Sequence, residues 1–263
     1  MPLEKRRNIG FGMLIGLISF VFTVLYIFCF YALTRKELRE KSCYKIMIML
    51  GVYDMITLPL TGMFAAYQAI SGITFCDSPL LQYCIGMVVL AAWIGYSWGT
   101  IILALNRVLF TTRAREYFDG RFIYLWLAVP PMITFLSMWY LNPAMFIPMY
   151  GGYLFNPYAG LLEIGDDTWY DNPKHTASDF VFMAVLPMIY AYFYFKNKYF
   201  LSKGGAVSST GNSKREKSLF IQCVLISTLV CAATAGCTFM QIVPMPHWCI
   251  ALSHFLWILV QGK

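Results

Sequence analysis

Charged residues are scarce in this chain. Of its 263 residues, only 13% are Asp, Glu, Lys or Arg and 59% are hydrophobic, whereas soluble domains contain about 25% charged and roughly 45–50% apolar residues. A soluble core could not bury this excess, and no polar stretch is long enough for a separate soluble domain. We therefore expect residues 1–263 to form one all-α domain embedded in a lipid bilayer.

The residue patterns of enzymes and transporters are also missing. The sequence has no zinc-type histidine pair, no glycine-rich phosphate loop and no pair of intramembrane acids spaced for proteolysis. Its three histidines are scattered at positions 175, 247 and 254. Inverted repeats and broken mid-membrane helices, which mark many transporters, are not visible. We expect no catalytic site, no metal and no cofactor, and keep a small-molecule transporter as a less favoured alternative.

Long apolar segments separated by charged residues are what the chain does contain. A membrane helix needs about 20 apolar residues, and prolines and glycines after Leu141 end one such run. The first run is too long for a cleaved signal segment, so we interpret it as a retained span. We predict a seven-transmembrane bundle with spans near 9–34, 45–70, 80–107, 122–141, 176–196 and 218–242, and a partial span at 248–261.

The last apolar segment is short. Cys249 to Gln261 gives about 20 Å of helix against about 30 Å of hydrocarbon. Its polar end would be stranded in lipid unless the segment lies at the outer interface or packs within the protein. We therefore expect six complete spans and an incomplete seventh.

Basic residues alternate between the connecting segments. Fifteen Lys and Arg residues lie in the first, third and fifth connections, whereas Lys174 alone lies in the second and fourth. The positive-inside rule places the richer set in the cytoplasm and the N-terminus outside, although Lys5, Arg6 and Arg7 oppose this orientation. The net charge of +7 is then a topology signal, and no nucleic-acid partner is needed.

Several sequence blocks are shared with a known family. They are Ser42-Cys43-Tyr44-Lys45-Ile46-Met47, Leu50-Gly51-Val52-Tyr53-Asp54-Met55, Gly72-Ile73-Thr74-Phe75-Cys76-Asp77-Ser78-Pro79, Leu103-Ala104-Leu105-Asn106-Arg107, Phe155-Asn156-Pro157 with Tyr170, Asn172 and His175, and Phe220-Ile221-Gln222. In these blocks the chain resembles the nematode serpentine receptor class T (Srt-type) chemoreceptors, which are rhodopsin-like, seven-transmembrane G-protein-coupled receptors. The resemblance covers most of the chain.

The resemblance implies a chemosensory receptor at the plasma membrane. Such a receptor binds a small molecule from the extracellular side and signals to a heterotrimeric G protein, and sensory-neuron cilia are a fitting location. Because the last span is short, a truncated, non-signalling receptor or a membrane partner protein stays open as the alternative.

Polar residues within the spans are the candidates for the signalling switch. Asp54 lies about 13 Å beyond Lys45, near mid-bilayer, where an acid usually pairs inside the bundle. It is interpreted as a switch residue or as a structural acid. The resemblance places Arg107 at the G-protein surface, or it merely anchors the helix end. Asn106 stands where related receptors carry an acid, which leaves Glu216 as the candidate partner.

A ligand pocket is expected between the outer halves of the spans. Its candidate residues are Tyr67, Gln68, Trp93, Tyr96, Ser97 and Gln241. An aromatic cavity with few polar groups suits a small organic ligand. Aromatic residues also serve packing and interfacial belts, so each of them has a purely structural alternative.

Three of the eight cysteines face the outside in this topology: Cys76, Cys84 and Cys249. Cys76 could pair with Cys249 or with Cys84, or none of the three forms a bridge, because sequence alone cannot fix connectivity.

Overall fold

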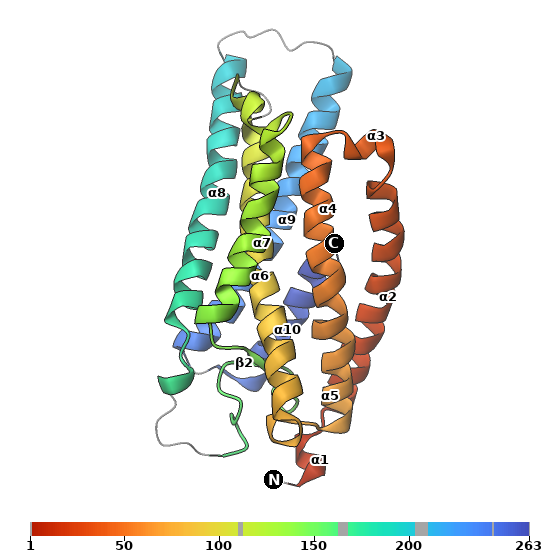
Figure 1. Ribbon diagram of the computed structural model, residues 1–263, viewed down its shortest axis with the longest axis vertical. Coiled ribbons are helices and arrows are strands. Elements are labelled where there is room, and N and C mark those ends of the chain that lie inside the picture. Colours follow the sequence, from red (N-terminus) through yellow and green to blue (C-terminus); the bar gives the residue numbers. More distant parts are fainter. Residues whose placement is uncertain (1, 110–112, 163–167, 203–209, 244, 263) are drawn as a thin grey trace.

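A bundle of long helices makes up the molecule (Figure 1). The computed structural model describes residues 2–109, 113–162, 168–202, 210–243 and 245–262, with side chains except at 113–115, 196–202, 210–224 and 226. The elements are α1 Leu3–Arg6, α2 Ile9–Leu33, α3 Lys36–Arg39, α4 Ser42–Leu58, η1 Pro59–Phe64, α5 Ala65–Ser71, η2 Phe75–Asp77, α6 Pro79–Leu109, η3 Arg113–Phe118, α7 Phe122–Tyr140, β1 Met145–Ile147, β2 Gly152–Leu154, η4 Thr168–Tyr170, α8 Pro173–Ser202, α9 Thr210–Ile242 and α10 His247–Gln261.

Five helical segments among the described residues are long and apolar enough to cross a membrane: Ile9–Leu33, Ser42–Ser71, Pro79–Leu109, Phe122–Tyr140 and Pro173–Phe195. Two shorter apolar segments, Ser227–Ile242 and His247–Gln261, follow them. The predicted all-α membrane bundle is confirmed at this level. Continuous helices are the expected solution, because a helix satisfies its own backbone hydrogen bonds where no water is present.

The helices differ sharply in how much of their surface the bundle covers. In α6, 78% of the most apolar window is buried, and α6 contacts α4, α7 and α8. In α2 the corresponding figure is 11%, although its mean hydropathy is 2.5. An apolar surface of this size is not stable in water. We conclude that α6 forms the centre of the bundle and that α2 presents most of its surface to lipid.

A π-helical turn interrupts the second long helix. Pro59 begins η1, which joins α4 to α5 as one continuous helical segment from Ser42 to Ser71. Gly62 of η1 lies against Ser19 of α2, and a Cβ atom added at Gly62 would overlap the Ser19 side chain. Small residues at such contacts let membrane helices approach closely. The turn therefore fixes the close contact between α2 and the second long helix.

The connection between α7 and α8 folds back into the bundle as a β-hairpin. Strands β1 and β2 pair antiparallel with Phe146 opposite Tyr153, and Gly151, with φ of 66°, closes the turn between them. Phe146 and Ile147 are fully buried, and Gly152 lies against Ile250 of α10. The hairpin therefore covers one end of the bundle, the same end as the N-terminus (Figure 1).

The final helix packs inside the bundle. α10 contacts α9, α4, α2 and β2, and its 15 residues span about 22 Å. Gln261, at its end, is buried, and its Oε1 accepts a hydrogen bond of 2.6 Å from the Thr61 hydroxyl of η1. The polar end of the segment thus finds a partner within the protein.

The basic N-terminus is held at the same end of the bundle by the connection between α5 and α6. Arg6 lies 3.7 Å from the carboxylate of Asp77, and Arg7 Nε donates to the carbonyl of Ser71. Asp77 also accepts hydrogen bonds from the backbone N–H and hydroxyl of Thr74, which, together with Arg6, hold the pKa of Asp77 below its ordinary value. These contacts explain how two of the three N-terminal basic residues are accommodated there.

We expect Gly62→Ala to destabilise the protein, because the new methyl group must displace Ser19 and separate α2 from η1. Overpacking of this kind costs roughly 1–3 kcal/mol. Thermal unfolding in detergent micelles measures the effect. Gly10→Ala is the matched control, since a Cβ there meets nothing within 4 Å; equal unfolding temperatures for the two variants would contradict the proposed packing role of Gly62.

Candidate functional site

A cavity of about 620 Å³ lies between the helices and beside the hairpin, because Tyr153 and Leu154 of β2 are among its lining residues. Pockets for small organic molecules typically measure about 300–1,000 Å³. Residues of α6, β2, η4, α8, α9 and α10, together with the segments beside them, line it: Leu90, Trp93, Ala144, Tyr153, Leu154, Phe155, Asn156, Ala159, Tyr170, Asp171, Asn172, Pro173, His175, Thr176, Ala177, Phe180, Ala233, Cys237, Met240, Gln241, His254 and Trp257.

Aromatic rings form the deep wall of this cavity. Trp257 of α10 meets the ring of Trp93 edge-on, with centroids 5.7 Å apart, and meets Tyr153 in the same way at 5.6 Å. Phe155 packs edge-on against His175, with centroids 5.4 Å apart. Edge-to-face contacts of this kind are favourable beyond the area that they bury. The rings therefore support one another and hold the cavity open with a fixed shape.

A buried carboxylate joins three helices beside the cavity. Asp179 of α8 is 1% exposed. Its Oδ1 accepts a hydrogen bond of 3.2 Å from Trp93 Nε1–H of α6, and its Oδ2 accepts one of 3.1 Å from the Thr238 hydroxyl of α9. His175 Nδ1 lies 3.6 Å from the same Oδ2. An acid inside an apolar bundle is costly unless it is paired, and Asp179 is paired on both oxygens.

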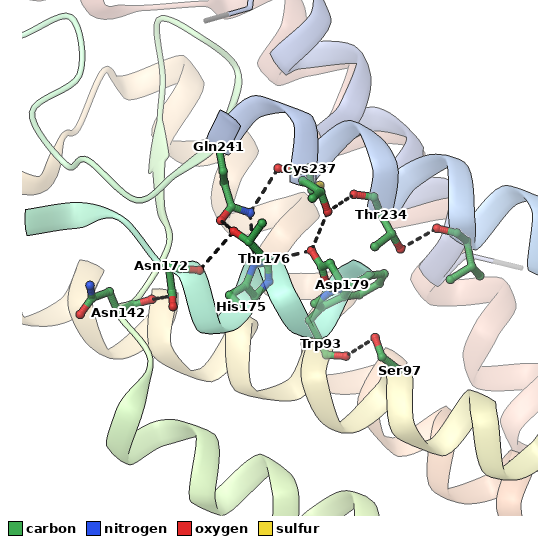
Figure 2. Close-up of polar contacts among 12 residues, drawn as sticks. Trp93, Ser97, Asn142, Asn172, His175, Thr176, Asp179, Thr234, Cys237 and Gln241 are labelled. Atoms are coloured by element: carbon green, nitrogen blue, oxygen red, sulfur yellow. Dashed lines mark hydrogen bonds and ion pairs between the residues drawn. The ribbon is translucent and has the colours of Figure 1, made fainter. Parts of the chain in front are cut away.

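A chain of amide and hydroxyl groups extends this network toward the hairpin end (Figure 2). Gln241 Nε2 lies 3.2 Å from His175 Nδ1, and Gln241 Oε1 accepts a hydrogen bond of 2.7 Å from the Thr176 hydroxyl. Asn172 Nδ2 donates to the carbonyl of Asn142 at 3.0 Å. The network thus fixes α8 against both α9 and the beginning of the hairpin connection.

The residues proposed from the sequence for the pocket divide into three groups. Trp93 and Gln241 line the cavity. Tyr96 stacks on Trp93 and Ser97 donates to the Trp93 carbonyl, so both lie directly behind the wall. Gln68 is buried against Gln82, and Tyr67 is exposed on the bundle surface; neither of them lines the cavity.

Three residues that line the cavity were not proposed from the sequence, namely His175, His254 and Trp257, and neither was Asp179 beside it. A signal for His175 and Asp179 was present, because an acid inside an apolar segment, four residues after a histidine on one helix face, indicates a buried polar pair. No such signal marked His254 or Trp257, since their burial depends on how α10 docks.

The proposed switch residues lie away from the cavity. Asp54 of α4 is buried and accepts a hydrogen bond of 2.7 Å from the hydroxyl of Tyr26 of α2. In the last turn of α6, Asn106 Nδ2 donates to Ser42 Oγ at 3.3 Å, and Arg107 Nη2 lies 3.9 Å from Met47 Sδ. Glu216 stands in α9, but its side chain lies outside the described part of the structure.

The cysteines proposed for a disulfide are all free thiols. Cys76 and Cys84 are exposed, and Cys249 is partly buried. Of the open possibilities, the structure has neither a Cys76–Cys249 nor a Cys76–Cys84 bridge. Among the described residues, no group of three or more His, Cys, Asp or Glu side chains is placed to hold a metal ion.

We expect Asp179→Ala to lower the thermal stability of the protein strongly, because it leaves the buried indole N–H of Trp93 without an acceptor and removes the contact to Thr238, whose hydroxyl keeps only the Thr234 carbonyl. Each lost charged hydrogen bond is worth about 1.5–3 kcal/mol. Asp179→Asn keeps one carbonyl oxygen and should lose less than half as much. Unfolding temperatures in detergent test this order; equal and small losses for both variants would contradict the structural role of the carboxylate.

Comparison with known proteins identifies the family of the bundle. The profile of the family described as "Serpentine type 7TM GPCR chemoreceptor Srt" matches residues 2–263. The chain is also similar to serpentine receptor class T-55 of Caenorhabditis elegans, with 22% identity over 221 residues. This match covers 83% of the chain but 59% of the length of that relative. On the strength of the whole-chain profile match, the chain belongs to the Srt family of serpentine, seven-transmembrane chemoreceptors.

Proposed function

We propose that this protein is a chemosensory G-protein-coupled receptor that binds a small molecule in the cavity beside Asp179 and signals at the opposite end of the bundle. The observation that carries the proposal is the cavity itself, because it combines suitable size, aromatic walls and a few converging polar groups. These are the usual properties of small-molecule sites. Membership of a chemoreceptor family supports the same conclusion.

The cavity should open toward the outside of the cell. The hairpin and the N-terminus lie at the cavity end, whereas α3 lies at the other end (Figure 1). The connection that contains α3 carries five of the fifteen basic residues counted above, from Arg35 to Lys45. By the positive-inside rule this end faces the cytoplasm, which leaves the cavity and the N-terminus extracellular.

Helix α6 is the proposed route of communication between the two ends. Trp93 contributes to the cavity wall, and Arg107 lies 14 residues later on the same helix, about 21 Å away. Between them, Tyr96 stacks on Trp93. A ligand that moves Trp93 therefore acts on a buried helix that reaches the cytoplasmic end.

Asp179 couples the cavity to a second helix as well. It accepts one hydrogen bond from Thr238, which lies on α9, and another from Trp93, which lies on α6. A change at the cavity can therefore shift α6 and α9 relative to each other. Such a shift would open a cleft beside Arg107 for a heterotrimeric G protein. Asp54, bonded to Tyr26, is proposed to stabilise one of the two arrangements of the bundle.

Arg107 has the features expected of a contact to the G protein. Its Nε atom is buried and has no hydrogen-bond partner among the described residues, and its Nη2 donates a long hydrogen bond of 3.9 Å to the thioether of Met47. A guanidinium with unused donors can bind backbone carbonyls of an inserted helix.

Arg107→Ala should abolish ligand-evoked G-protein signalling without changing the amount of protein at the cell surface. A panel of small odorants, applied to cells that express the chain with a promiscuous G protein and a calcium reporter, measures this. Arg39→Ala is the control, because Arg39 is an exposed basic residue of the same end. Preserved signalling in Arg107→Ala would contradict the assignment of Arg107 as a contact to the G protein.

A cavity-filling substitution tests the binding site separately. Ala159→Trp places an indole at the rim of the cavity, where Ala159 is only half-buried, so folding should survive. We expect at least a tenfold loss of potency for every active odorant, since the volume for the ligand is reduced. Ala32→Trp, on the exposed face of α2, should have no effect. Unchanged potency in Ala159→Trp would move the ligand site elsewhere.

A further inference from the structure

Two buried hydrogen-bond donors in the cavity wall have no partner. Trp257 Nε1 and His175 Nε2 make no hydrogen bond within the described part of the chain, although both residues line the cavity. Trp257 is 6% exposed and His175 is 4% exposed. A buried polar group without a partner destabilises a fold, and such groups in native structures mark a missing partner such as a ligand.

The surrounding network assigns the His175 ring nitrogen as a donor. Gln241 Nε2 faces the Cys237 carbonyl at 3.4 Å as well as His175 Nδ1 at 3.2 Å. A carbonyl only accepts hydrogen bonds, so the amide nitrogen must point toward it and also toward His175. In the neutral ring His175 Nδ1 is then the acceptor of the pair and Nε2 carries the proton; in a ring that is ion-paired with Asp179, whose Oδ2 lies 3.6 Å from Nδ1, both ring nitrogens carry protons. The unpartnered atom is therefore an N–H group.

Most acceptors next to the cavity already have partners. Gln241 Oε1 accepts from Thr176, and Asp179, which accepts from Trp93 and Thr238, is not among the residues that line the cavity. Asp171, the carboxylate among the lining residues, is exposed at the rim. His254 also lines the cavity, and both of its buried ring nitrogens have no partner among the described residues; as a neutral ring it adds one donor and one acceptor. The unpartnered nitrogens of the deep wall therefore include more donors than acceptors.

From this arrangement we propose that the cavity selects an uncharged aromatic molecule that carries a hydrogen-bond acceptor, such as the carbonyl oxygen of an aryl ketone. The acceptor receives hydrogen bonds from Trp257 and His175, and the rings of the ligand pack between Trp93, Trp257 and Phe155. This inference rests on the proposed function, in which the cavity is the ligand site, and it adds the chemical class of the ligand.

A protonated amine is the competing class of ligand. It differs from the ketone because it carries a positive charge and hydrogen-bond donors in place of an acceptor. Aromatic walls attract cations through the faces of their rings, which favours an ammonium ion. The donors of an ammonium group, however, would face the donors of Trp257 and His175, and Asp179 is not among the residues that line the cavity. The donor arrangement therefore disfavours the cation.

Three probes of nearly equal shape separate these possibilities: benzophenone, which has an acceptor; diphenylmethane, which has no polar group; and diphenylmethanamine, which is a cation at neutral pH. Each is used in tritiated form with the purified chain in phosphatidylcholine nanodiscs, and binding to empty nanodiscs is subtracted. We expect the ketone to bind about tenfold more tightly than the hydrocarbon, and the amine to bind most weakly.

Trp257→Phe tests the source of this preference, because it removes the donor and keeps an aromatic ring. The preference for the ketone over the hydrocarbon should fall by roughly tenfold. Trp98→Phe is the matched control, since Trp98 lies on α6 outside this cavity, and its preference should equal that of the native chain. If Trp257→Phe prefers the ketone over the hydrocarbon as strongly as the native chain does, Trp257 is not the hydrogen-bond donor to the ligand.

Other results of the binding assay would also overturn the proposed ligand class. Equal binding of ketone and hydrocarbon, or tightest binding of the amine, overturns the proposed ligand class but leaves a small-molecule site in place. Failure of all three probes to bind overturns the ligand class as well. The proposed function fails independently of this assay, when the odorant responses are unaffected by Ala159→Trp and Arg107→Ala.

Discussion

The hydrogen bonds of the Asp179 carboxylate are the interaction on which the rest of the cavity depends. One acid of α8 holds an indole of α6 and a hydroxyl of α9, all of them buried. In a bundle surrounded by lipid there is no water to replace a lost partner, so this connection defines where three helices meet. The position of Trp93, and with it the deep wall of the cavity, follows from it.

Other polar contacts extend the same principle along the bundle. A hydrogen bond from Tyr26 to Asp54 joins α2 to α4. Another, from Thr61 to Gln261, joins η1 to the end of α10. Each contact pairs residues from different helices at a buried position. Apolar side chains pack as well against lipid as against each other, so such polar pairs and close glycine contacts, rather than hydrophobic burial, select one arrangement of the helices. The proposed signal uses this property, because a ligand needs to disturb only a few specific contacts.

The β-hairpin gives the cavity its second essential boundary. Phe146 and Ile147 are buried within the end of the bundle, and Tyr153 contributes to the aromatic wall with His254 and Trp257. A ligand that reaches the cavity therefore meets a folded connection and not an open bundle end. The unpartnered nitrogens of His175 on α8 and Trp257 on α10 lie behind this cover, and the proposed ligand preference depends on them.

The sequence by itself determined the class of the protein, because hydrophobic runs of membrane length and alternating basic connections depend on local composition alone. It also singled out Asp54 as a buried acid, and Trp93 and Gln241 as pocket residues, from their depth in the predicted spans. Tyr67 and Gln68, which were proposed with them, do not line the cavity, since the direction of a side chain around a helix depends on which neighbours that helix packs against. The joining of Asp179 to Trp93 and Thr238, and the docking of His254 and Trp257 against the hairpin, were decided only by tertiary structure. These contacts connect residues far apart in the chain, and their geometry arises from the packing of whole helices, which no local pattern encodes.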